Sequence, residues 1–121
     1  MTGREKLFFG WEFDAAAKKL PDEVLDYYVG LLSNPESLRA TFGFYRALDA
    51  TIAQDRERAS RRLAMPVLAI GGAASFGEHV GEALRLVAPD VQSVVIPDTG
   101  HFVAEESPAG LLAALEPFLT A

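Results

Sequence analysis

Apolar side chains recur every three or four residues through the first half of the chain, the spacing that places them on one face of an α-helix. This pattern predicts a helix over residues 4–20, which Pro21 then interrupts. Pro21 and the two acidic residues after it suit the first turn of a second helix. The residues expected on the buried faces of these two helices are Leu7, Phe8, Trp11, Ala15, Leu25, Tyr28, Val29 and Leu32.

The pair Asn34-Pro35 predicts the start of a third helix, because an asparagine side chain caps free backbone amides and proline suits the first turn. Helical spacing then continues without a break and predicts one long helix whose charged stretch over 55–62 is solvated. Gly43 costs this helix about 1 kcal/mol relative to alanine and indicates a bend or close packing. The apolar positions of the helix are Leu38, Phe42, Tyr45, Leu48 and Ile52.

The pattern changes near Met65, where an uninterrupted apolar run over 66–72 ends in two glycines. Such a run predicts a strand that is covered on both faces, as in a parallel sheet. A helix over 78–87, a second strand over 91–96 and a last helix starting at 107–108 follow. We therefore predict an α/β fold in which residues 1–64 form a helical segment and residues 65–121 form a β-α-β-α tail with parallel strands.

Two strands do not complete such a sheet, because a strand buried on both faces needs neighbours along both of its edges. Three explanations stay open at this point. The missing strands come from another polypeptide, the chain is truncated, or the segment packs in an unusual way.

Composition excludes several classes of function. The chain has 17 acidic and 11 basic residues and a net charge of -6, which disfavours nucleic acid and anionic membrane surfaces as partners. It has no cysteine and only two histidines, far apart in sequence, so we expect no disulfide, no metal site and no cofactor. No apolar run approaches the roughly 20 residues that span a bilayer, and we expect a cytoplasmic protein.

His101 is the residue with the clearest potential for chemistry. It follows Gly100 in the loop after the second predicted strand, and open α/β sheets build their sites in loops at the carboxyl ends of strands. An imidazole exchanges a proton near neutral pH and can serve as a general base. From position alone, a catalytic base and an ordinary loop histidine that caps a helix or meets solvent are equally good interpretations.

Three stretches of the second half together resemble the closing portion of the α/β-hydrolase superfamily. They are the strand over 66–72, the tripeptide Ser75-Phe76-Gly77, and the segment 95–108, which reads VIPDTGHFVAEESP. Their character is most like that of epoxide hydrolases and the related fluoroacetate dehalogenases. The resemblance implies that His101 is the base that activates water to hydrolyse a covalent ester on an aspartate nucleophile.

The segment Phe44-Tyr45-Arg46-Ala47, with the residues from Asn34 to Phe42 before it, resembles the cap helix of epoxide hydrolases. In that family the tyrosine of a Tyr-Arg pair donates a hydrogen bond to the epoxide oxygen, which implies this role for Tyr45. A phenol is ordinarily protonated at neutral pH and can stabilise the alkoxide formed when the ring opens. On the residues alone, Tyr45 belongs to the apolar stripe of its helix and packs in the core.

The sequence departs from the family in what it lacks. It contains neither a Gly-x-Asp-x-Gly or Gly-x-Ser-x-Gly nucleophile elbow nor a His-Gly-type oxyanion loop. Ser75 stands where many members place the acid of the triad, and a serine does not stabilise an imidazolium as a carboxylate does. Glu78 and Asp98 are nearby carboxylates, better explained as a helix N-terminal charge and a turn residue. Some members take their acid from an earlier strand, which would lie upstream of this chain.

The resemblance covers essentially all 121 residues and begins in the cap (lid) domain, so we expect a chain that starts midway through a hydrolase. The leading hypothesis is the cap and C-terminal portion of an epoxide-hydrolase-like enzyme that acts on a small molecule once the half with the nucleophile is present. One alternative is a haloacid or haloalkane dehalogenase-like hydrolase, because the ester chemistry is shared. Another is a non-catalytic module that associates with itself or with an N-terminal half through its open sheet edge.

Overall fold

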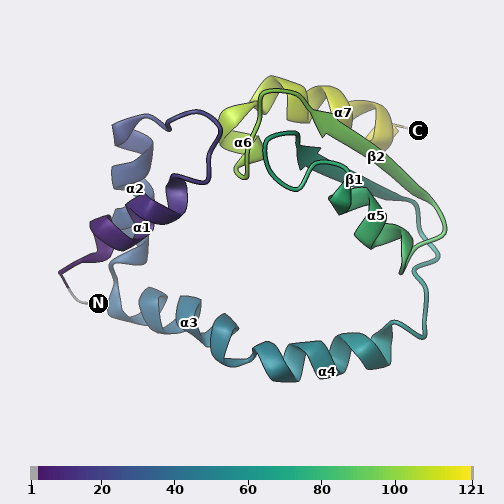
Figure 1. The fold of residues 1–121 in the computed structure, drawn as a ribbon, viewed down its shortest axis with the longest axis horizontal. Helices are drawn as coiled ribbons and strands as arrows, with labels where there is room; N and C mark the ends of the chain where they lie inside the picture. The colour runs from purple at the N-terminus through teal and green to yellow at the C-terminus, as the bar shows by residue number, and fades with distance from the viewer. Residues whose placement is uncertain (1–2, 121) are drawn as a thin grey trace. The chain divides into compact units, whose positions relative to one another are not determined.

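The computed structural model describes residues 3–120, which divide into two compact units. One unit comprises Met1–Asp14 and Leu20–Ser60, and the other Ala15–Lys19 and Arg61–Ala121, within the limits of the described residues. Helices make up the first unit, whereas the second combines two strands with three helices (Figure 1). The predicted order, helical segments followed by a β-α-β-α tail, is confirmed.

The first unit contains the helices α1 (Glu5–Phe13), α2 (Asp22–Leu32), α3 (Pro35–Arg46) and α4 (Leu48–Arg58). Aromatic contacts join the first three of them. Phe13 stacks on Tyr28 with ring centroids 5.6 Å apart, and Phe8 meets the ring of Phe42 edge-on at 6.0 Å. Such pairs add stability beyond the area that they bury. The apolar side chains buried in this unit are Phe9, Leu20 and Val29.

A helix was predicted over residues 4–20, but α1 ends at Phe13. The prediction is therefore wrong for the residues after Phe13. Residues 15–19 instead belong to the second unit, where the backbone N–H of Ala17 donates a hydrogen bond to the Glu106 carboxylate at 2.7 Å. Leu7 and Trp11, expected on the buried face, are exposed. The reason is that α1 packs on α2 through other positions, such as Phe13.

The start of the third helix is as predicted, because the Asn34 side chain accepts a hydrogen bond from the Glu36 N–H at 2.8 Å. The single long helix is wrong, since the chain leaves the helical conformation at Ala47 (φ -90°, ψ 2°). The Ala47 N–H is shared between two carbonyls, as is common at helix ends. The close packing considered for Gly43 is wrong, because nothing lies within 4 Å of the place where its Cβ would be.

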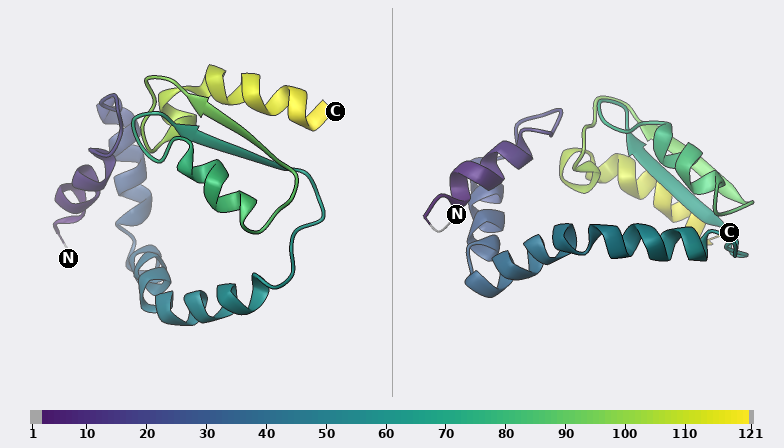
Figure 2. Two further views of the ribbon diagram at one scale, coloured as in Figure 1. Left: turned by 45° about the vertical axis from the view of Figure 1, so that its right-hand side comes forward. Right: turned by 60° about the horizontal axis from the view of Figure 1, so that its bottom comes forward.

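The second unit contains β1 (Val67–Gly72), α5 (His79–Arg85), β2 (Val91–Ile96), α6 (Val103–Glu106) and α7 (Pro108–Thr120). The two strands are parallel, with Val67 opposite Val91 and Gly72 opposite Ile96. The views of Figure 2 show α5 on one face of this sheet and α7 on the other. Both predicted strands and both long helices of the tail are confirmed, while the one-turn helix α6 was not predicted.

Gly72 lets the end of β1 lie directly against the loop that follows β2. A Cβ at Gly72 would sit 2.1 Å from the carbonyl oxygen of Gly100 and 2.5 Å from that of Thr99, closer than any real contact. A larger residue at this position would push the two backbones apart. The paired glycines that end the first strand are therefore required by packing between strand ends.

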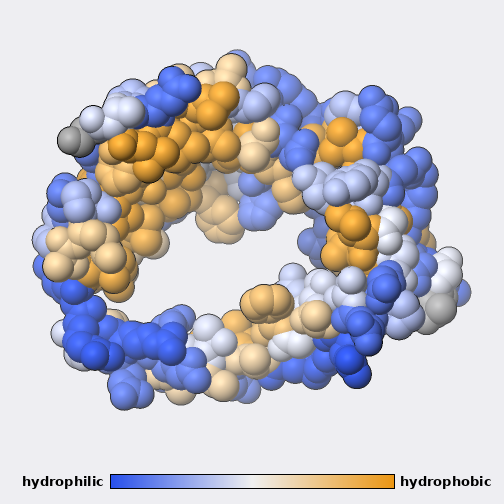
Figure 3. All heavy atoms as spheres, turned by 180° about the vertical axis from the view of Figure 1, so that it is seen from behind, coloured by the Kyte–Doolittle hydropathy of each residue, from blue (hydrophilic) through white to orange (hydrophobic). Residues whose placement is uncertain are grey.

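Much apolar surface of the second unit is open to solvent. Figure 3 shows apolar side chains gathered on this unit, and the sheet within the described residues has two strands, so each strand has one unpaired edge. Exposed sheet edges and apolar patches of this kind are typical of surfaces that pair with further chain. Among residues 3–120, no helix has the length and apolar character needed to cross a membrane. The large apolar residues exposed on the unit include Phe76, Leu86, Leu112 and Leu119.

We expect Gly72→Ala to lower the free energy of unfolding by about 1–3 kcal/mol, because the added methyl group forces a backbone shift in a packed region. Gly43→Ala is the matched control, since α3 leaves open space there and alanine favours a helix interior by about 1 kcal/mol. Denaturant unfolding of the two variants and the parent protein measures both effects. Equal stability of the two variants would contradict the close approach at Gly72.

Candidate functional site

The loops that follow β1 and β2 meet at the carboxyl end of the sheet. The Ala73 N–H donates to the Ile96 carbonyl and the Ala74 N–H to the Thr99 carbonyl, each at 2.9 Å. Thr99 is fully buried, and its hydroxyl donates to the Pro97 carbonyl at 2.9 Å. These bonds hold the loop of residues 97–102 against the end of the neighbouring strand, so its position is set by the sheet.

A cleft of about 180 Å³ opens between these two loops. Its walls are mostly apolar, and His101 lies at its edge, so the predicted position of this residue at a strand-end site is observed. A mostly apolar cleft with a few polar groups fits a small molecule of low polarity. The lining residues are Ile70, Gly71, Gly72, Ser75, Phe76, Val80, Gly100, His101 and Val103.

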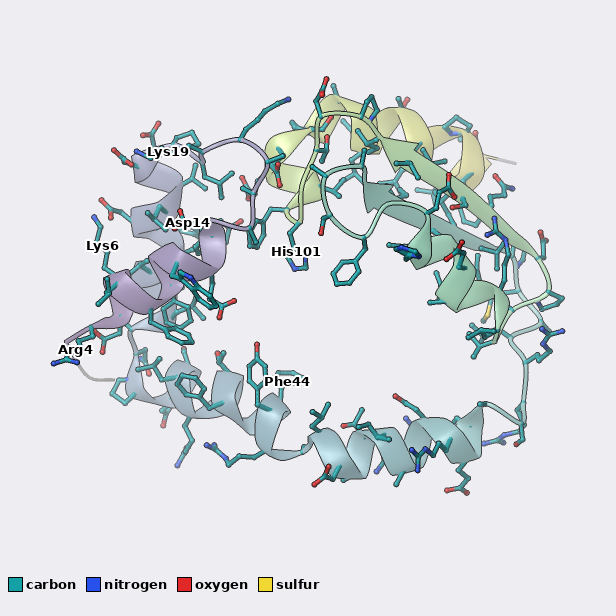
Figure 4. All side chains as sticks on the ribbon, in the orientation of Figure 1. Arg4, Lys6, Asp14, Lys19, Phe44 and His101 are labelled. Carbon is teal, nitrogen blue, oxygen red and sulfur yellow. The ribbon has the colours of Figure 1, made fainter. Side chains whose placement is uncertain are left out.

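The His101 side chain is exposed and projects from its loop (Figure 4). Its ring lies edge-on to Phe102 at a centroid distance of 5.1 Å and is tilted against Phe76 at 6.0 Å. Neither ring nitrogen has a hydrogen-bond partner in the part of the chain that the structure describes. Aromatic contacts therefore limit the ring's movement, while both nitrogens stay available to a ligand or to water.

A carboxylate holds the backbone on both sides of His101. Glu106, on α6, accepts hydrogen bonds from the Gly100 N–H at 2.8 Å and from the Phe102 N–H at 2.9 Å. It also accepts the bond from Ala17 already described, and we call this set of bonds the Glu106 clasp. The absence of a side chain at Gly100 makes the clasp possible, because a Cβ there would lie 2.4 Å from the Ala17 nitrogen.

Two opposing effects act on the pKa of Glu106. Partial burial raises it, but hydrogen bonds from the backbone N–H groups of Gly100, Phe102, Ala17 and Lys18 lower it further than burial raises it. The net shift is downward, so the ionised carboxylate is the form that the fold favours. Sequence reasoning assigned Glu106 no role. The only sign of such a role in the sequence is that this glutamate follows the candidate histidine by five residues. The hydrogen bond that joins it to Ala17 spans 89 positions and has no local pattern.

The candidate acids of the triad do not contact His101. Glu78 lies at the N-terminal end of α5 and accepts a hydrogen bond from the Ser93 hydroxyl at 3.4 Å, and Asp98 is a turn residue with a φ of 50°. Ser75 lines the cleft but makes no side-chain bond to the imidazole. Within residues 3–120, no carboxylate is hydrogen-bonded to the His101 ring.

Tyr45 lies on α3 in the first unit and is 70% exposed. The interpretation of Tyr45 as a core residue of its helix is therefore wrong for this unit. The guanidinium of its neighbour Arg46 donates to the Arg39 carbonyl at 3.0 Å, along the same helix. Tyr45 therefore belongs to the first unit and His101 to the second, and each is described with the residues of its own unit.

Nothing in the described residues forms a candidate metal site. No group of three or more histidine, cysteine, aspartate or glutamate side chains converges between residues 3 and 120. The second histidine, His79, is exposed on α5 and is bonded through its Nδ1 to Glu82 at 2.7 Å. The described residues around His101 therefore provide no ligand set for a metal ion.

Known proteins resemble this chain in sequence and in structure, although no protein-family model matches it. A soluble epoxide hydrolase of Corynebacterium sp. (strain C12) is 28% identical over 97 residues, which make up 80% of this chain and 34% of that protein. The crystal structure of Cfl2 from Burkholderia cenocepacia superposes with a TM-score of 0.88 and 32% identity, covering 96% of this chain and 41% of that one.

The Cif epoxide hydrolase from Acinetobacter nosocomialis gives a TM-score of 0.86 with 28% identity, covering 93% of this chain and 38% of that one. Each comparison therefore matches most of this chain. The chain itself spans well under half the length of these relatives.

The lowered pKa of Glu106 predicts a loss of stability in acid. A carboxyl group with a depressed pKa in the folded state adds stability above its ordinary value of 4.5, and this contribution disappears as the pH falls through the folded-state pKa. We expect Glu106→Gln to destabilise the protein at neutral pH and the difference from the parent to shrink below pH 4.5. Denaturant midpoints measured across this pH range test it, with Glu116→Gln as the control for loss of one charge. A difference that stays constant with pH would rule the clasp out as its source.

Proposed function

We propose that this chain is the cap and C-terminal portion of an epoxide-hydrolase-like enzyme of the α/β-hydrolase superfamily. His101 is its general base and Tyr45 its hydrogen-bond donor for ring opening. The nucleophilic aspartate belongs to a part of the hydrolase that these 121 residues do not contain. Support comes from the likeness to epoxide hydrolases along most of the chain.

The proposed reaction has two steps. In the first, an aspartate oxygen attacks an epoxide carbon, the carbon–oxygen bond of the ring breaks, and the Tyr45 hydroxyl stabilises the oxygen that leaves as an alkoxide. In the second, His101 takes a proton from water, and the resulting hydroxide attacks the ester carbonyl. The bond between the acyl carbon and the ester oxygen breaks, the proton held by His101 and the remaining proton of the water pass to the two product oxygens, and a diol leaves while the aspartate is restored as a carboxylate. Neither step needs a metal or an organic cofactor.

The observation that carries this proposal is the position of the His101 imidazole. It lies at the edge of an apolar cleft at the carboxyl ends of two parallel strands, and its nitrogens have no partner among the described residues. A general base must reach water and an ester from a fixed position, and the bonds between the two loops provide that fixed position. An imidazole that served only packing would not need both nitrogens open.

The exposure of Tyr45 supports its proposed role. Because Tyr45 is 70% exposed, its phenol can donate a hydrogen bond to a ligand without first leaving a packed core. The leaving group decides how much such a donor contributes, because an alkoxide is a far stronger base than chloride or bromide and depends more on a hydrogen bond. An epoxide substrate therefore gives Tyr45 the larger role.

The unpaired edges of β1 and β2 are proposed to pair with the rest of the hydrolase sheet. In this assembly the portion with the nucleophile covers the apolar surface of the second unit and faces His101. Self-association of the 121 residues through the same edges is the competing arrangement. Sizing of the purified chain with and without the remaining portion separates the two.

We expect His101→Gln, in the enzyme completed with its nucleophile portion, to reduce turnover of an epoxide by roughly 10²–10⁴-fold, the contribution typical of a general base. The covalent ester should accumulate, because its formation does not use His101. Intact-protein mass spectrometry after mixing with the epoxide detects this adduct. His79→Gln is the matched control, since His79 is exposed and bonded to Glu82 on a different helix. Full turnover by the His101 variant would remove it from the mechanism.

We expect Tyr45→Phe to slow formation of the ester on the order of 10²-fold, as loss of one donor to a developing oxyanion does. The change should be smaller with a chlorinated or brominated substrate, because chloride and bromide are far weaker bases than an alkoxide and gain less from a hydrogen bond. Rapid-quench measurement of the ester with both substrates makes the comparison. Tyr27→Phe, which alters another exposed tyrosine on α2, is the control. An unchanged rate with epoxide would return Tyr45 to a surface role.

A further inference from the structure

We propose that Glu106 is a positioning residue for His101, holding the backbone on both sides of the histidine and joining it to residues 15–17. The proposal rests on the general-base role proposed for His101. It adds a residue that never touches the substrate but determines where the imidazole sits.

The two oxygens of the Glu106 carboxylate divide the bonds between them. Oε1 accepts from the Phe102 N–H at 2.9 Å, and Oε2 accepts from the Gly100 N–H at 2.8 Å and the Ala17 N–H at 2.7 Å. Gly100 and Phe102 are the residues directly before and after His101. The Phe102 N–H belongs to the peptide group directly after His101, and the Gly100 N–H to the peptide group that precedes Gly100. Fixing these two groups limits the combined backbone rotation at Gly100 and His101, which sets the direction of the His101 Cα–Cβ bond.

His101 depends on this backbone support because it has little of its own. Its N–H reaches the Ala15 carbonyl only at 3.4 Å, and its side chain has ring contacts but no hydrogen bond within the described residues. In many catalytic sites a carboxylate orients the imidazole directly. Here Glu106 acts one step back, through the peptide groups.

Charge makes the clasp stronger than neutral bonds would. An ionised carboxylate accepts without donating, so it suits a cluster of converging N–H groups, and bonds to a charged acceptor are roughly twice as strong as neutral ones. A glutamine in its place presents an NH₂ group to at least one of these N–H groups and loses that bond. An aspartate keeps the charge but is shorter by one methylene group.

The downward shift of the Glu106 pKa agrees with this geometry, since backbone N–H groups outweigh burial as its cause. The titratable side chains on the elements around the clasp are Lys18 and Lys19 from the segment 15–19, Glu105 from α6, and Asp98 and His101 from the loop. None of these side chains is among the causes of the shift in the Glu106 pKa, and Lys18 contributes only through its backbone N–H. The backbone amides, rather than a neighbouring charge, therefore hold the carboxylate ionised.

Nuclear magnetic resonance of the complete, ¹⁵N-labelled protein tests the clasp without relying on activity. In the parent protein the amide signals of Gly100, Phe102 and Ala17 should shift together as Glu106 titrates in acid. Glu106→Gln should abolish the shared titration and broaden the His101 signals, Glu106→Asp should restore the titration in part, and Glu116→Gln should leave all four residues as in the parent. Independent behaviour of the three amides, or unchanged His101 signals in Glu106→Gln, would overturn the proposal.

Kinetics on the complete enzyme separates positioning from general stability. We expect Glu106→Gln to reduce kcat for ester hydrolysis by roughly 10- to 100-fold, because a catalytic group displaced by about 1 Å loses on that order of rate, while KM changes little. Glu106→Asp should recover part of kcat. A fall in the amount of folded enzyme alone, with normal kcat per folded molecule, would reduce Glu106 to a structural residue. If the parent enzyme opens no epoxide, the proposed function fails, and the amide titration still decides whether the clasp holds His101.

Discussion

The close contact between the ends of two parallel strands is the constraint on which the second unit depends. Parallel strands bring their carboxyl ends to the same edge of a sheet, and Gly72 allows the loop after β2 to lie against the end of β1. Backbone hydrogen bonds from Ala73 and Ala74 then join the two loops. These bonds join backbone groups, so they hold the loops around His101 together without side-chain contacts.

The Glu106 clasp extends this frame to a segment far away in sequence. The helical spacing of apolar side chains extends to Ala15, yet the helix ends at Phe13. A carboxylate with converging N–H donors competes with continued helix formation, since each peptide N–H bonds either within the helix or to Glu106. The chain between α1 and α2 thus becomes part of the unit that contains His101, although both of these helices belong to the other unit.

The sequence was sufficient to predict those elements that depend on neighbouring residues alone. The two strands, the helix α5 and the cap at Asn34 follow from runs, periodicity and capping residues, and the loop position of His101 follows from the strand before it. The break at Ala47 carries no glycine or proline, and the end of α1 depends on Glu106, 89 positions beyond Ala17. The amino-acid sequence of one protein does not reveal which residues so far apart lie in contact, so this hydrogen bond could not be predicted. The proposed chemistry of His101 and Tyr45 came from resemblance to a family, since position alone left other interpretations open.

Folding and catalysis are linked in the proposed enzyme by the same surface. The unpaired edges of β1 and β2 and the exposed apolar residues, among them Leu86, Leu112 and Leu119, are stabilised when further strands and helices cover them. Those strands would also bring the nucleophile to the carboxyl end of the sheet. His101 lies there, and its ring nitrogens have no hydrogen-bond partner among the described residues. The two-step ester mechanism suits this division, because the base is needed only after the nucleophile has reacted. A frame that keeps His101 in place through backbone bonds is therefore more useful here than one that holds the imidazole itself.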